Sequence, residues 1–137
     1  MTLTPKDAGW IEVICGSMFS GKTEELIRRL RRAQIAQMPT IIFKPRIDSR
    51  YSETHIVSHN KMKLESHLVN TPQEILDLAE NASVVAIDEA QFFNDSILDV
   101  CKTLASQGKR VVVAGLDTDY RGVPFGPMPQ LMREADY

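Results

Sequence analysis

The residues best suited to chemistry stand in one glycine-rich segment near the start of the chain. Residues 16–23 read G-S-M-F-S-G-K-T and fit the phosphate-loop pattern G-x-x-x-x-G-K-[ST]. The two glycines let the backbone turn its N–H groups toward phosphate oxygens, and the lysine can reach the β- and γ-phosphates. The threonine hydroxyl usually binds the Mg²⁺ ion that accompanies the nucleotide. The segment therefore predicts a nucleoside triphosphate site formed by Gly16, Ser17, Met18, Phe19, Ser20, Gly21, Lys22 and Thr23.

A second reactive group is the pair of acids Asp88 and Glu89, which directly follows an apolar run. Residues 83–87 read S-V-V-A-I, which is typical of a parallel strand buried on both faces, so the acids emerge at its carboxyl end. In a phosphate-loop domain an acid at that place points toward the metal, and Asp88 is expected to hold Mg²⁺ directly or through water. Glu89 is placed to take a proton from an attacking hydroxyl or water and is the candidate general base.

The elements that position these residues alternate between strand and helix. β-Branched residues predict a strand at 10–15, for which we expect a buried central place, and apolar residues at helical spacing predict a helix at 21–37. Further strands are expected at 40–44, 83–88 and 110–115, and further helices at 71–81 and 95–107. This order predicts an α/β fold of the P-loop NTPase type, with a mostly parallel sheet flanked by helices and ligands at the carboxyl ends of its strands.

The segment between the second strand and the second helix is polar. Residues 45–60 are rich in serine and of mixed charge, so we expect a mobile surface loop, with short strand-like runs at 55–58 and 64–69. The next helix has a clear start, because Thr71, Pro72 and Glu74 form a capping box with proline at the first helical position. We expect one domain over residues 1–137, in which 45–70 is a flexible loop or hairpin.

Composition narrows the class of protein. The 137 residues include 16 Lys and Arg against 18 Asp and Glu, a net charge of −2, which lacks the basic surface that nucleic acid or an anionic membrane would favour. No apolar run approaches the roughly 18 residues of a membrane helix, so a cytoplasmic location is expected. Cys15 and Cys101 stand alone and are expected as reduced core thiols, with no zinc site in the chain.

Three other sequence patterns match features of other protein classes. Residues 88–91 match the D-E-x-x box of helicases, but a second motor domain is not visible. Residues 119–122 match the D-x-x-G pattern of GTPases, whereas the N-K pair at 60–61 lacks the following acid that reads guanine. Acids at Glu24 and Glu25 precede a basic cluster by four residues, which favours a solvated helix face over a nucleic-acid patch for Arg28, Arg29, Arg31 and Arg32.

Four motifs together resemble the cellular-type, or type II, thymidine kinases in a bacterial-like form. They read G-S-M-F-S-G-K-T at 16–23, F-K-P-R-I-D-S-R-Y at 43–51, D-E-A-Q-F-F at 88–93 and G-L-D-T-D-Y-R-G-V-P-F-G at 115–126. The resemblance implies that ATP donates its γ-phosphoryl group to the 5′-hydroxyl of thymidine to give dTMP for nucleotide salvage. It also implies dTTP as a feedback inhibitor and a homotetrameric assembly.

The resemblance assigns further roles to single residues. Glu89 would be the base on the 5′-hydroxyl, and Gln91 would join Asp88 in the nucleotide-binding box. Asp48 would help Thr23 and Asp88 to organise Mg²⁺, directly or through water. Arg50 would add positive charge near the phosphates, and the positions that match the nucleoside pocket are Met18, Leu116, Tyr120 and Phe125, of which Tyr120 can stack on the base.

Members of the family continue into a C-terminal domain that binds zinc through four Cys or His ligands and carries a lasso loop around the thymine. The sequence ends at Tyr137 without such a set, so we expect zinc only in that further domain, and the donor site and base within this chain. Two alternatives to a thymidine kinase stay open: a nucleotide-binding fragment that is silent without the acceptor lid, and a phosphate-loop ATPase that acts on nucleic acid.

Overall fold

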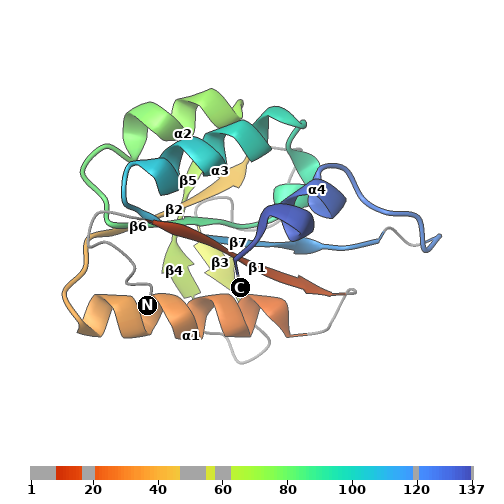
Figure 1. Cartoon of the computed structure of the whole chain (residues 1–137). Helices are drawn as coiled ribbons and strands as arrows, with labels where there is room; N and C mark the ends of the chain where they lie inside the picture. The colour runs from red at the N-terminus through yellow and green to blue at the C-terminus, as the bar shows by residue number, and fades with distance from the viewer. Residues whose placement is uncertain (1–8, 17–20, 47–54, 58–62, 119–120, 137) are drawn as a thin grey trace, which may run out of the picture.

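The computed structural model describes residues 9–16, 21–46, 55–57, 63–118 and 121–136. A five-stranded sheet lies between one long helix on one face and a group of shorter helices on the other (Figure 1). The helices are α1 (Lys22–Ile35), α2 (Pro72–Leu78), α3 (Ser96–Ser106) and α4 (Met128–Glu134), with a 3₁₀ turn η1 at Ala90–Phe92. The predicted α/β class with a parallel sheet is confirmed.

The strands of the sheet are all parallel and follow the order β1-β7-β6-β2-β5. Their bounds are Trp10–Gly16 for β1, Thr40–Pro45 for β2, His67–Val69 for β5, Val84–Ile87 for β6 and Arg110–Leu116 for β7. The expectation of a central place for the first strand was wrong, because β1 lies at the edge of the sheet. Asp136 covers part of this edge: its N–H donates to the Ile11 carbonyl at 2.8 Å, and its carboxylate accepts the Ile11 N–H at 2.9 Å.

Two apolar layers hold the helices against the sheet. Leu26, Ile27 and Leu30 of α1 pack with one face, and residues of α2, α3 and α4 pack with the other. β6 contributes to both layers, and all four of its side chains are fully buried, as the continuous apolar run predicted. Cys101 lies inside the second layer, where burial raises the pKa of its thiol to about 12. The prediction of a core thiol is confirmed there, whereas Cys15 is only half-buried.

The strand-like runs predicted at 55–58 and 64–69 are present, but the second is divided into two strands. It is interrupted at the buried Ser66: β4 (Lys63–Glu65) pairs with β3 (His55–Val57) in an antiparallel sheet, while β5 joins β2. The proposed mobile loop falls mainly on 47–54 and 58–62, outside the described residues. The capping box is present, since the Glu74 carboxylate accepts the Thr71 N–H at 2.7 Å, but α2 ends at Leu78 rather than near residue 81.

None of the helices in the described part of the chain combines the length and the apolar composition that a bilayer crossing requires.

Candidate functional site

The carboxyl ends of the parallel strands bring the predicted site residues to one edge of the sheet. β1 ends at Gly16, β6 ends just before Asp88, and β7 ends at Leu116. Gly16 and Leu116 are partners in the register of β1 and β7, and the Asp117 N–H donates to the Gly16 carbonyl at 3.3 Å. Open α/β sheets bind their ligands at this edge, so the topology places the two sequence motifs where a shared ligand would lie.

The phosphate-loop motif has the predicted context of strand, loop and helix. Its first glycine ends β1, and α1 begins with Lys22. Gly21, the residue before the helix, has φ 85°, a left-handed conformation that a side chain disfavours. The first turn of a helix presents free N–H groups and the positive end of its dipole, which suits an anion at Gly21 and Lys22. The residues between the two glycines, 17–20, lie outside the described part of the chain.

Asp88 is a buried acid at the end of β6, with only 6% of its surface exposed. Its N–H donates to the Phe43 carbonyl at 2.8 Å, and its Oδ1 accepts the Glu89 N–H at 2.9 Å. Burial and the negative charge of Glu89 raise the pKa of Asp88 to about 6, although the Glu89 N–H and the charges of Lys22 and Lys44 act in the opposite direction. The ionised form is therefore costly here until more positive charge approaches.

Lys44 is a site residue that sequence reasoning missed. It follows Phe43 in β2 just as Asp88 follows Ile87 in β6, and Phe43 and Ile87 are partners in the register. Side chains alternate along a strand, and the residues two positions earlier face α1, so Lys44 and Asp88 project from the same face of the sheet. Lys44 is 8% exposed. The sequence signal for Lys44 is a lysine at the end of an apolar strand, in the same position relative to its strand as Asp88.

Glu89 has an unusual backbone. Its φ of 53° and ψ of 41° place a non-glycine residue in the left-handed region, which in the described chain happens only here and at Gln37. Such a conformation costs about 1 kcal/mol or more and recurs at functional sites. The half-buried Glu89 opens η1, and its carbonyl accepts the Phe92 N–H at 3.1 Å. The turn holds Glu89 directly beside the buried Asp88.

Two of the predicted nucleoside-pocket residues lie near η1. The Leu116 N–H donates to Oε1 of the buried Gln91 at 3.1 Å. Phe125 makes an edge-to-face contact with Phe92, with ring centroids 5.4 Å apart. Both Leu116 and Phe125 are half-buried. The other predicted contacts of the phosphates, metal and nucleoside fall outside the described residues: Ser17, Met18, Phe19, Ser20, Asp48, Arg50 and Tyr120.

The oxygen atoms present at this edge suit Mg²⁺ rather than a metal held by many side chains. Within the described ranges no group of three or more His, Cys, Asp and Glu residues is placed to hold a metal. Mg²⁺ keeps several waters and usually takes one or two carboxylates together with phosphate oxygens. The Asp88 carboxylate and the Thr23 hydroxyl fit that requirement.

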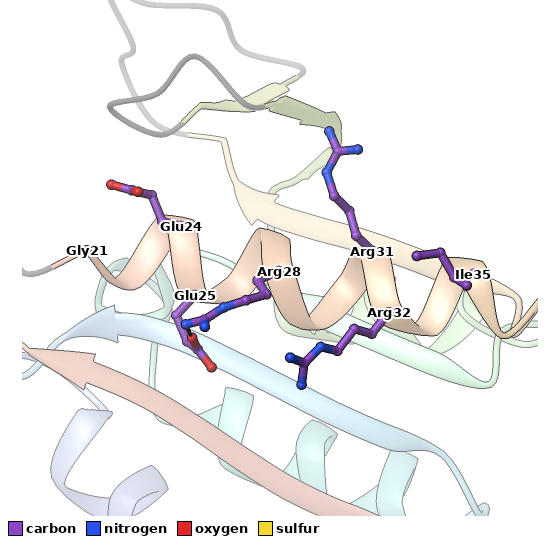
Figure 2. A pocket seen from close by; sticks show the side chains of 7 residues that line it. All are labelled: Gly21, Glu24, Glu25, Arg28, Arg31, Arg32 and Ile35. Carbon is purple, nitrogen blue, oxygen red and sulfur yellow. Dashed lines mark hydrogen bonds and ion pairs between the residues drawn. The ribbon is translucent and has the colours of Figure 1, made fainter.

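An open groove of about 500 Å³ follows the outer side of α1 (Figure 2). The predicted Glu25–Arg29 ion pair is present at 2.7 Å, and Glu25 also pairs with Arg28. The groove is therefore a charged helix face, as expected, and its lining residues are Gly21, Glu24, Glu25, Arg28, Arg31, Arg32 and Ile35.

Comparison with known proteins gives one family and one fold. The family model described as thymidine kinase matches residues 9–137. A thymidine kinase of Rhodothermus sp. (strain ITI 518) is 64% identical over 129 residues, which cover 94% of this chain and 61% of that protein. The chain thus spans about three fifths of the length of this relative.

Among solved structures, the genome packaging NTPase B204 of Sulfolobus turreted icosahedral virus 2, in complex with ATP-γS, has a TM-score of 0.55 at 18% identity, covering 93% of this chain and 72% of that one. The ATPase DotB of Legionella pneumophila has a TM-score of 0.53 at 12% identity, covering 98% of this chain and 36% of that one. At such low identities the likeness shows the fold alone.

Proposed function

This chain belongs to the thymidine kinase family, and we propose that it transfers the γ-phosphoryl group of ATP to the 5′-hydroxyl of thymidine, giving dTMP and ADP. The observation that carries the proposal is the buried Asp88 beside Glu89 at the carboxyl edge, with two lysines near it. A buried acid with a raised pKa in such surroundings is typical of a functional site.

The donor side of the reaction uses the phosphate loop. Lys22 and the amides of residues 16–21 hold the β- and γ-phosphates, and the start of α1 adds its dipole. Thr23, Asp88 and Asp48 would hold Mg²⁺, which when bound neutralises charge on the phosphate oxygens. Lys44 adds a second ammonium group beside Asp88. These positive groups stabilise the charge on the transferring phosphoryl group.

The acceptor side depends on Glu89. As the 5′-oxygen of thymidine forms its bond to the γ-phosphorus and the bond to ADP breaks, the carboxylate of Glu89 takes the hydroxyl proton. The half-buried position and the fixed left-handed backbone of Glu89 support this role, because a base must be held within hydrogen-bond reach of its proton.

The thymine would be held by apolar and aromatic side chains. We propose Met18, Leu116, Tyr120 and Phe125 for this pocket, with Tyr120 stacked on the base, and Arg50 near the phosphates. The proximity of Leu116 and Phe125 to η1 supports their part, since both approach the turn that begins with Glu89. Feedback inhibition by dTTP, a homotetrameric assembly and a cytoplasmic location belong to the same proposal and rest on the family.

Separation of labelled products tests the proposed reaction. The full chain is incubated with Mg²⁺, γ-labelled ATP and each of thymidine, deoxyuridine and deoxycytidine, with the variants Glu89→Gln and Glu80→Gln in parallel. Glu80 is an exposed acid near the end of α2 and serves as the matched control. We expect label in dTMP from the unmodified chain and from Glu80→Gln, and a rate lower by about 10²–10⁴ for Glu89→Gln with ATP binding retained.

Other outcomes contradict the proposal in distinct ways. Bound ATP with no label in any nucleoside would overturn the kinase activity. ATP hydrolysis that rises with added single-stranded nucleic acid, without transfer to thymidine, would favour an ATPase. Equal transfer by Glu89→Gln would leave the reaction intact and remove the assignment of the base.

A further inference from the structure

The side chain of Gln91 is buried between the turn that carries the acids and the end of β7. It is 5% exposed, and its Oε1 accepts the Leu116 N–H at 3.1 Å. A backbone N–H can only donate, so this contact fixes which end of the carboxamide faces β7. The contact joins residues 25 positions apart in the chain and is a side-chain link between η1 and β7. Gln91 therefore connects the turn that begins with Glu89 to the strand end beside the phosphate loop.

Two glycines allow the chain to approach Gln91 closely. A Cβ atom at Gly115 would lie 2.8 Å from Oε1 of Gln91 and 2.8 Å from the sulfur of Met128. A Cβ atom at Gly126 would lie 2.5 Å from the main-chain oxygen of Gln91, and Gly126 itself has φ 53°. Any side chain at either position would have to displace Gln91 or its neighbours. Gln91 is therefore close-packed on two sides as well as hydrogen-bonded.

The segment that follows β7 is tied to the same turn. The Phe125 N–H donates to the Asp117 carbonyl at 3.1 Å, and Thr118 and Pro124 form an isolated bridge. The ring of Phe125 meets the edge of Phe92, the residue after Gln91. Leu116 at the end of β7, and Phe125 and Gly126 further along, thus all lie against the turn at 89–92. This segment includes Leu116 and Phe125, which the proposed function assigns to the nucleoside.

We propose that Gln91 is a positioning residue that holds the turn of Glu89 in fixed relation to Leu116 and to the chain at Phe125 and Gly126. The proposal rests on the function proposed above, because it concerns the alignment of the base with the acceptor. Misplacement of a reacting group by about 1 Å can cost on the order of 100-fold in rate. The resemblance assigns Gln91 to nucleotide binding, and the bond from the Leu116 amide to its side-chain oxygen supports an indirect, positioning role.

The variant Gln91→Met tests this role. Methionine keeps the length of the side chain and most of its volume but cannot match the Leu116 N–H as the carboxamide does. Gln73→Met makes the same chemical change on the exposed side of α2 and is the control. For Gln91→Met we expect kcat to fall by about 10–100-fold, while the Kd of ATP changes by less than about twofold. Gln73→Met should leave both quantities unchanged.

A double variant identifies the group through which Gln91 acts. In the Glu89→Gln background the base is already lost, so the further change Gln91→Met should lower kcat by less than about twofold. A second full reduction would overturn the proposal, because it would mean that Gln91 acts independently of Glu89. An increase in the Kd of ATP at constant kcat would overturn it in favour of a direct nucleotide contact. A lower Tm with unchanged kcat would reduce Gln91 to a structural residue.

Hydrogen exchange tests the link without any turnover. In Gln91→Met the Leu116 amide should exchange at least about tenfold faster, because it loses its acceptor, while the Val112 amide inside β7 keeps its rate. An unchanged rate at Leu116 would contradict the link itself. This measurement stays decisive if no nucleoside is phosphorylated, so failure of the proposed function and failure of the positioning role can be told apart.

Discussion

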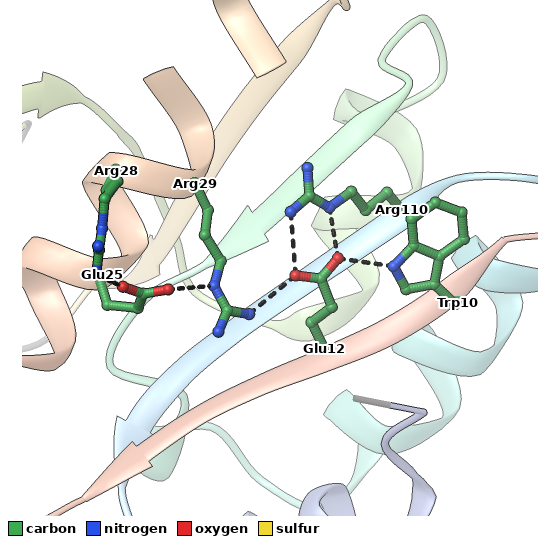
Figure 3. A network of polar contacts seen from close by, with 6 residues as sticks. All are labelled: Trp10, Glu12, Glu25, Arg28, Arg29 and Arg110. Carbon is green, nitrogen blue, oxygen red and sulfur yellow. Dashed lines mark hydrogen bonds and ion pairs between the residues drawn. The ribbon is translucent and has the colours of Figure 1, made fainter. Parts of the chain in front are cut away.

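Two acids of equal burial project from the same face of the sheet, one inside the edge strand β1 and one just past the carboxyl end of β6, and the chain surrounds them differently. Glu12 of β1 and Asp88 after β6 are each 6% exposed. Glu12 accepts hydrogen bonds from the guanidinium of Arg110, from Arg29 at 2.9 Å and from the Trp10 indole at 2.7 Å (Figure 3). The side chain of Asp88 accepts a hydrogen bond from the backbone N–H of Glu89. One acid is enclosed by donors, and the other stands beside a second acid.

The pKa values of the two acids move in opposite directions. Burial raises the pKa of Glu12, but its bonds to Arg110, Trp10 and Arg29 outweigh burial and bring the pKa below its ordinary value. Burial and the charge of Glu89 raise the pKa of Asp88 to about 6. Burial alone therefore does not distinguish a functional acid from a structural one. Glu12 joins β1, β7 and α1 through two arginines, whereas Asp88 keeps a raised pKa despite the charges of Lys22 and Lys44, as is typical of a functional site.

The largest expected effect is on turnover and comes from a change at the carboxyl edge of the sheet. In Lys22→Met the phosphates lose their ammonium contact, so kcat should fall by about 10²–10³. The free energy of unfolding should stay within about 1 kcal/mol, since the change lies at a half-exposed helix start. Lys102→Met, on the exposed side of α3, is the control. Equal kinetics of the two variants would contradict the assignment of Lys22.

The second effect is on stability and concerns Glu12. Glu12→Gln removes the carboxylate that Arg110 and Arg29 share, although Arg29 keeps Glu25, and should lower the free energy of unfolding at pH 7 by about 2–4 kcal/mol. Because the folded pKa of Glu12 is lowered, this stabilisation is present above its ordinary pKa and is lost as pH falls through the folded value. Denaturant curves at several pH values check this. A deficit that persists at low pH would show that charge is not its source.

The third effect has the opposite sign. The raised pKa of Asp88 means that the folded chain holds a proton more firmly than the unfolded chain between about pH 4 and pH 6, so its contribution is favourable at low pH and is lost as pH rises through about 6. Without metal or nucleotide, Asp88→Asn should therefore raise the free energy of unfolding at pH 7 by about 2–3 kcal/mol, and by almost nothing below about pH 4. Denaturant titration in chelator measures it. Destabilisation at pH 7 would refute this view of Asp88.

Much of the site could be predicted because its signals are local. The glycines and Lys22 at the start of α1, and Asp88 at the end of an apolar run, are fixed by the chain next to them. Their meeting at one edge follows from parallel strands alone. The prediction of the α/β class needed nothing more than the alternation of strand and helix.

The remaining features depend on contacts that are distant in sequence. The edge position of β1 is set by its pairing with β7, and a run of β-branched residues does not distinguish an edge strand from a central one. Glu12 binds Arg110 across 98 positions, and Gln91 binds Leu116 across 25. The sequence around Glu89 does not predict its left-handed backbone either, because glycine and asparagine are the residues that usually adopt that conformation.

The smallest expected effect is on stability and concerns the aromatic pair near the carboxyl edge. Phe92 is 45% exposed and meets Phe125 edge to face. Phe92→Leu removes this aromatic contact and should lower the free energy of unfolding by about 1 kcal/mol or less, as measured by thermal or denaturant unfolding. The Kd of ATP should not change, since neither ring belongs to the phosphate loop. A change in ATP affinity would mean that the aromatic pair reaches the donor site.

A carboxyl ¹³C NMR titration of the two acids in one sample tests the central claim most directly. The chain is labelled at Asp and Glu, kept free of metal and nucleotide, and the signals are assigned with Asp88→Asn and Glu12→Gln. Asp88 should titrate near pH 6 and Glu12 below its ordinary pKa, although both are equally buried. If Asp88 titrated near pH 4, or if both acids shifted in the same direction, the charges of Lys22 and Lys44 would already offset the burial of Asp88, and the contrast between the two acids would not exist.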